Sequence, residues 1–140
     1  MVKSAKKPSV KGLKKYHIHT IYVGERINLK LVKEFSGNKF LNRNHPLVAE
    51  LGEDKYAVLT KFGTVTFWNS SEEEVKRFLH EIEKYIEGEV GHWSHGDTLN
   101  VYVGATEEHF TFEDAYIKDI DIEKIKIISY VLQLSIFATL

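Results

Sequence analysis

Apolar and polar positions change their spacing early in the chain. Residues 16–23 hold alternating β-branched and aromatic side chains, which is typical of a strand. Ile27, Leu31 and Phe35 are instead spaced by four. This spacing predicts a helix over residues 25–35, closed by the Ser-Gly pair that follows.

The middle of the chain combines a polar segment with a hairpin signal. Residues 37–54 are rich in Asn and hold Pro46. We expect a loop there, and its length favours a short helical turn at residues 46–51. Two β-rich runs follow at residues 55–61 and 64–69. The Phe-Gly pair between these runs predicts a tight hairpin.

The helix signal after residue 69 is the clearest in the chain. Ser70 and Ser71 are followed at three-residue spacing by Glu73 and Glu74, which is the pattern of a capping box. Gly88 is expected to end this helix. The apolar positions of the helix form one stripe, namely Val75, Phe78, Leu79, Ile82 and Ile86.

Four further segments complete the pattern. Residues 88–97 hold Gly, Ser and His and predict a loop, whereas residues 98–104 alternate as a half-buried strand does. A short strand is expected at residues 109–116. Residues 122–140 predict a final helix.

The order of these elements predicts an α+β fold. Through Gly104 it reads β-α-β-β-α-β, the split βαβ pattern of ferredoxin-like folds. We therefore expect a ferredoxin-like antiparallel sheet covered by two helices on one face, with an extra strand and a C-terminal apolar helix. In this prediction residues 16–140 form a single domain, and residues 1–15 form a flexible basic leader.

The final helix is apolar on two sides, so it needs two packing partners. It is either buried within its own domain, or it packs on another protein or on a continuation of the chain. We favour a homo-oligomer or a protein partner. The dense apolar part, residues 127–140, is shorter than the roughly 20 residues of a membrane span. The predicted interaction positions are Ile125, Ile128, Val131, Leu132 and Ile136.

Charge is distributed unevenly along the 140 residues, although the formal net charge is −1. Six Lys and no acidic residue lie in residues 1–15, leaving 13 basic against 20 acidic residues in the remainder. An acidic body argues against a nucleic-acid partner.

The absence of Cys excludes disulfides and favours a cytoplasmic location. Depletion of thermolabile residues favours a thermophilic source.

Histidines are the candidate metal ligands. His17 and His19 share one strand face because side chains alternate along a strand. His92 and His95, together with Asp97, lie in a predicted loop and offer imidazole and carboxylate ligands. A metal site needs three or four convergent ligands, and we favour histidines that hold no metal. A His-dependent metal-binding protein or enzyme is the alternative hypothesis.

No motif predicts catalytic residues or a cofactor. The chain lacks the Gly-x-Ser-x-Gly sequence of a nucleophile elbow and any glycine pattern of a dinucleotide-binding loop. The acidic run Glu72, Glu73 and Glu74 is explained by the dipole of the helix that it opens. We therefore expect a protein that is not an enzyme.

An RNA-binding module linked to translation is the second alternative, because some ferredoxin-like sheets stack bases on exposed aromatic side chains. Tyr56, Trp68 and Tyr102 are the candidates for such a face. Without interleaved Lys or Arg, we expect low affinity. The positions expected on the opposite face are Val65, Phe67 and Val101.

Three segments resemble the required-for-meiotic-nuclear-division family, which is catalogued as a domain of unknown function. Residues 55–69 are similar to its hairpin, residues 24–29 to the start of its first helix, and residues 120–135 to a later helix. The hairpin positions that carry the resemblance are Phe62, Gly63, Val65, Phe67 and Trp68.

The resemblance implies the N-terminal α+β half of a longer protein, because relatives continue into a helical region and usually a C-terminal transmembrane segment. It also implies a scaffold or membrane-associated role rather than catalysis. We therefore predict a non-enzymatic interaction domain that self-associates, or binds a protein partner, through its final helix.

Overall fold

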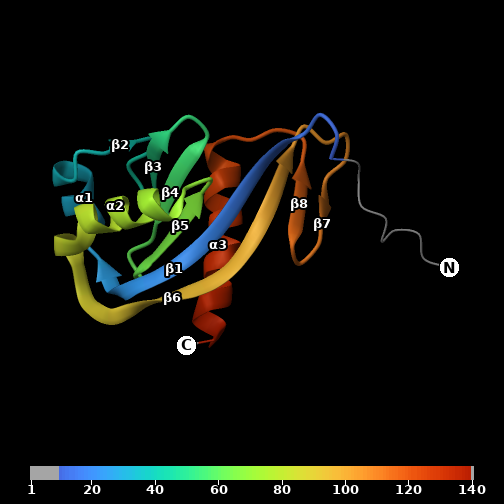
Figure 1. Ribbon diagram of the computed structural model, residues 1–140. Helices are drawn as coiled ribbons and strands as arrows, with labels where there is room; N and C mark the ends of the chain where they lie inside the picture. The colour runs from blue at the N-terminus through green and yellow to red at the C-terminus, as the bar shows by residue number, and fades with distance from the viewer. Residues whose placement is uncertain (1–9, 140) are drawn as a thin grey trace.

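An eight-stranded sheet forms the centre of the structure, with strand order β2-β3-β4-β5-β1-β6-β8-β7 (Figure 1). This computed structural model describes residues 10–139, and for residues 89–94 and 135–139 it describes the backbone alone. The strands are β1 (Lys14–Ile27), β2 (Lys39–Phe40), β3 (Leu47–Gly52), β4 (Lys55–Leu59), β5 (Thr64–Trp68), β6 (Ile86–Val103), β7 (His109–Phe110) and β8 (Asp114–Ile117).

The described residues also form α1 (Leu29–Phe35), α2 (Glu72–Ile82), the 3₁₀ helix η1 (Glu83–Tyr85) and α3 (Ile122–Thr139). Neighbouring strands pair antiparallel, except that β6 and β8 are parallel. The predicted α+β class and mostly antiparallel sheet are confirmed. The prediction of one extra strand is wrong, because β2 and β3 extend one side of the sheet and β7 and β8 the other.

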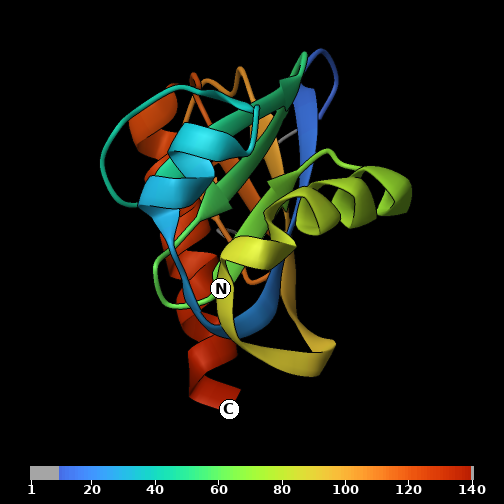
Figure 2. The same ribbon diagram turned by 90° about the vertical axis from the view of Figure 1, so that its left-hand side faces the viewer.

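Two hydrophobic cores lie on opposite faces of the sheet, and β1 contributes to both. Ile21 and Val23 pack with α1 and α2, whereas Tyr16 and Ile18 pack with α3. Figure 2 shows α2 and α3 on opposite sides of the strands. α1 and α2 share one face, where two helices were expected, and α3, whose face the sequence did not assign, forms a third layer on the other.

Buried polar groups as well as apolar contacts hold α3 against the sheet. The indole Nε1 of Trp68 donates to Ser129 Oγ at 2.8 Å, and Gln133 Nε2 donates to Thr66 Oγ1 at 2.8 Å. All four residues are buried. Although α3 has 18 residues, no helix among the described residues is both long and apolar enough to cross a membrane.

The burial of Trp68 corrects the predicted aromatic face. Trp68 is 0% exposed under α3, and Tyr56 packs beside it on the same core. Val101, expected opposite Trp68, lies in that core too. Tyr102 instead stacks on Tyr116, with ring centroids 4.9 Å apart. These aromatic side chains therefore form no common exposed platform.

The first strand is longer than predicted, and the first helix is shorter. β1 continues to Ile27, which pairs with Ile86 of β6. Asn28 then caps α1 by accepting from the backbone of Leu31. The helical spacing was misleading, because Ile27 belongs to the strand.

Of the predicted leader, residues 1–9 lie outside the described residues, while Lys14 already begins β1.

Two predicted loops are largely strand. The helical turn expected at residues 46–51 is β3, whose Leu47, Val48 and Ala49 are buried. Asn42 orders the preceding turn, because its Oδ1 accepts from Val48 N and its Nδ2 donates to Pro46 O. The loop expected at residues 88–97 lies within β6, which pairs along β1.

The predicted capping box is confirmed. Ser71 Oγ accepts from Glu74 N at 3.2 Å, and Glu74 Oε1 accepts from Ser71 N at 2.9 Å. Glu74 also forms an ion pair with Lys55 of β4 at 2.7 Å. These bonds lower the pKa of Glu74 to about 2, with the Lys55 hydrogen bond contributing most. The start of α2 is thus fixed to the sheet.

The predicted hairpin joins β4 and β5 through Gly63, which has a φ of 89°. A Cβ atom there would lie 1.7 Å from the carbonyl oxygen of Gly24 in β1. The carbonyl of Gly63 accepts from Val23 N at 2.9 Å. Only glycine fits this contact between backbones.

We predict that Gly63→Ala lowers the free energy of unfolding by roughly 3 kcal/mol or more, because the new methyl group must displace the backbone of β1. Gly37→Ala is the matched control. Gly37 also has a positive φ, 80°, but its missing Cβ faces open space, so its cost is limited to about 1 kcal/mol of backbone strain. Urea unfolding measures both, and equal losses would contradict the steric explanation.

Candidate functional site

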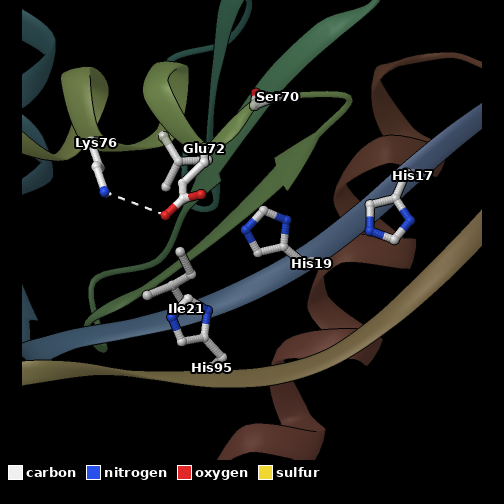
Figure 3. Close-up of a pocket in the computed structure, with 8 residues that line it drawn as sticks. His17, His19, Ile21, Ser70, Glu72, Lys76 and His95 are labelled. Carbon is white, nitrogen blue, oxygen red and sulfur yellow. Dashed lines mark ion pairs between the residues drawn. The ribbon is translucent and has the colours of Figure 1, made fainter.

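A cavity of about 280 Å³ lies between the start of α2 and the sheet (Figure 3). It opens on the α2 face of β1 and β6, where these strands extend beyond the helices. Its chemistry comes from imidazoles on the strands and from charged side chains on α2. The cavity is lined by His17, His19, Ile21, Ser70, Glu72, Val75, Lys76 and His95.

A β-bulge brings His95 to the same face as His19. On β1 the register advances two residues, from His19 to Ile21, while on β6 it advances three, from Thr98 to His95. The extra residue reverses the alternation of β6 at this point. His95 therefore joins His17 and His19 on the α2 face, as Figure 3 shows.

The three imidazoles form a stacked row. The ring centroids of His17 and His19 are 6.4 Å apart, and those of His19 and His95 are 6.5 Å apart. His19 also stacks on the buried ring of Phe67 at 5.7 Å. Burial lowers the pKa of His19 below its ordinary value, and the neighbouring His17 and His95 lower it further.

Hydrogen bonds hold the outer end of this row. His17 Nδ1 lies 3.2 Å from Asn100 Oδ1, and Asn100 Nδ2 donates to Asp114 Oδ1 at 3.2 Å. Asn69 Oδ1 accepts from the backbone of His17 at 2.7 Å. This network connects β1 with β6 and β8 and fixes one wall of the cavity.

The geometry divides the candidate metal ligands. His17, His19 and His95 lie together, but their rings stack side by side rather than converge on one point. Asp97 lines a groove beside α3 instead, and the side chain of His92 lies outside the described residues. Within the part of the chain that is described, no group of three or more ligand side chains is placed to hold a metal ion.

The α2 side of the cavity is polar. Lys76 Nζ and Glu72 Oε1 form an ion pair at 3.3 Å, and both side chains are mostly exposed. Ser70 Oγ is buried in the wall, without a hydrogen-bond partner among the described residues. Within the acidic run at the start of α2, Glu74 therefore caps the helix and Glu72 lines this cavity.

A second, apolar site lies on the opposite face, beside α3. A groove of about 350 Å³ runs between α3 and the β7–β8 hairpin. Several large apolar side chains at this groove are exposed, by 61% for Phe110, 103% for Phe112, 60% for Ile127 and 62% for Val131. The pattern of residues 109–116 predicted a strand here but not the exposed aromatic side chains.

The predicted interaction positions divide between the two sides of α3. Ile125 and Leu132 are buried against the sheet and Ile128 is half-buried, whereas Val131 is exposed. The side chain of Ile136 lies outside the described residues. Ile125 and Leu132 are therefore wrong as interaction positions, because they pack in the protein's own core.

Comparisons with known proteins give no match for this chain, neither to a family model nor to a curated protein or a solved structure. The resemblance of residues 55–69 to a family hairpin therefore stays a prediction. The two sites described above are the basis for inferring function.

We predict that acid destabilises the protein through His19. Its folded-state pKa is lowered, whereas an unfolded histidine titrates near 6.5. The contribution of His19 to stability is thus complete above about pH 6.5 and declines as the pH falls below it. Urea unfolding at about pH 7.5 and 5.5 should show this decline, and His19→Gln should reduce it.

His80→Gln is the control, because His80 lies on α2 with its side chain 84% exposed. This variant should keep the dependence of the unfolding midpoint on pH. A His19→Gln protein with the same dependence as the unsubstituted chain would contradict the assignment to His19.

Proposed function

We propose that this chain is a non-enzymatic interaction domain that self-associates, with a second copy of the chain on its α3 surface. The α3 surface consists of exposed side chains of α3 together with those of the β7–β8 hairpin. Its members are Phe110, Phe112, Ile127, Tyr130, Val131 and Leu134.

The observation that carries this proposal is the amount of exposed apolar surface. A fully exposed aromatic side chain presents roughly 150–250 Å². Because five of the six side chains are only partly exposed, the six together present on the order of 600 Å². The largest exposed apolar patch of a typical monomer is roughly 300–600 Å², so this surface lies at the upper end of that range. Two copies would bury about 1,200 Å², the lower limit of a specific, stable interface.

The shape of the surface favours a second copy as the occupant. Ile127 and Val131 line one edge of the groove between α3 and the β7–β8 hairpin and are 60% and 62% exposed, so they form a ridge along it. Under two-fold symmetry, the ridge of each copy enters the groove of the other. A surface that carries both halves of the contact is complementary to itself.

Charge does not oppose this arrangement. Asp97 lines the groove on one flank of α3, and Lys126, which pairs with Glu123 at 3.6 Å, lines the other flank. Because the formal net charge is −1, long-range repulsion between copies is small.

We also propose that the centre of the domain is a ferredoxin-like unit made of β1, α1, β4, β5, α2 and β6. Its support is the antiparallel order β4-β5-β1-β6, with α1 and α2 in one core. Membership of the required-for-meiotic-nuclear-division family is a proposal that rests on the hairpin at residues 62–68.

We predict a dimer in sedimentation velocity that dissociates on dilution. Phe112→Asp and Val131→Glu should each raise the dissociation constant about tenfold or more, about 1.4 kcal/mol, because each places a carboxylate in the apolar contact. Both side chains are exposed, so the urea midpoint should change little.

Phe35→Asp is the matched control. Phe35 is 64% exposed but lies on α1, on the opposite side of the sheet. Its substitution should leave the dissociation constant unchanged. A chain that stays monomeric at high concentration, or an equal loss of association in Phe35→Asp, would refute the proposal.

A further inference from the structure

We propose that the cavity between α2 and the imidazole row is a binding site for a divalent oxyanion of the sulfate or phosphate class, occupied when the histidines are protonated. The proposal is independent of self-association, since the cavity lies on the other face of the sheet. It rests on the donors that line this cavity, which are the three imidazoles, Lys76 and Ser70.

The spacing of the imidazoles favours a bound anion in acid. His19 lies between His17 and His95, with centroids only 6.4 and 6.5 Å away. Like charges at such separations oppose protonation of their neighbours. An anion in the adjoining cavity offsets that repulsion. A protonated imidazole donates from both ring nitrogens, so the row then presents several donors to one ligand.

The start of α2 adds further attraction. The N-terminus of this 11-residue helix carries partial positive charge, and the ammonium group of Lys76 lines the cavity. Ser70 Oγ in the wall is a buried hydroxyl without a partner among the described residues. An oxyanion is the ligand class that fits ammonium, hydroxyl and imidazolium donors together.

Carboxylates at the start of α2 oppose the anion, and they explain the requirement for acid, since Glu72, Glu73 and Glu74 all lie in the first turn of the helix. Glu72 lines the cavity and pairs with Lys76 at 3.3 Å. While the imidazoles are neutral, this pair leaves the cavity without net positive charge. Protonation of the row makes the cavity cationic, and Glu72, whose side chain is 84% exposed, can turn into solvent and release Lys76 to the ligand.

The test uses sulfate as the probe, because its charge stays the same across the pH range that titrates histidine. Calorimetry and NMR of the imidazole resonances follow binding at about pH 5.5 and 7.5. We expect binding at least tenfold tighter at the lower pH, and a sulfate-induced rise in the pKa of His19. Glycerol phosphate in a parallel titration distinguishes a phosphomonoester from a free anion as the preferred ligand.

Two variants and one control locate the site. His95→Gln should weaken sulfate binding about tenfold, and its exposed side chain makes loss of folding a minor concern. Lys76→Gln should weaken binding similarly. His80→Gln should have no effect, because the exposed His80 pairs with Glu83 outside the cavity.

Several results would overturn the proposal. They are equal affinity at both pH values, equal sulfate-induced shifts at His19 and His80, or unchanged binding by both cavity variants. Sedimentation of the sulfate-bound protein distinguishes the anion site from self-association. If the dimer forms equally with and without sulfate, sulfate binding is independent of dimer formation, and each proposal is tested by its own experiment.

Discussion

The alternation of side chains along β1 is the constraint on which both faces of the molecule depend. β1 lies between β5 and β6, so its register is fixed on two sides. Tyr16 and Ile18 enter the α3 core, while His17 and His19 face the cavity beside α2. A shift of one residue would exchange these sets and bury imidazoles under α3. Gly63 secures the register further along, where only a glycine allows the β4–β5 hairpin to approach Gly24.

The two-sided character of α3 follows from its place as the third layer. Ile125 and Leu132 supply the apolar contact with the sheet, and Ser129 and Gln133 add buried hydrogen bonds. Buried polar groups are costly without partners, so these bonds select one rotation of the helix about its axis. That rotation leaves Ile127 and Val131 exposed. The outer apolar side is therefore not required by the domain's own core.

Local patterns predicted much of the fold, and long-range pairing decided the remainder. The capping box at Ser71 and the Phe62-Gly63 hairpin were predictable because each involves residues close in sequence. The extension of β1 to Ile27 was not, since it depends on pairing with Ile86, 59 residues away in the chain. The burial of Trp68 depends likewise on a helix that begins at Ile122. For the cavity, alternation placed His17 and His19 together, but His95 was assigned to a loop.

The position of His95 shows why its role could not be inferred from alternation alone. Counting by twos from Asn100, which bonds His17, would place residue 95 on the α3 face. The bulge between Thr98 and His95 reverses that parity. Leu99 and Asp97 line the groove beside α3, as alternation places them, whereas the bulge turns His95, only two residues from Asp97, to the cavity beside α2. One extra residue in β6 thus adds the third imidazole to the row, and a deletion there would remove it.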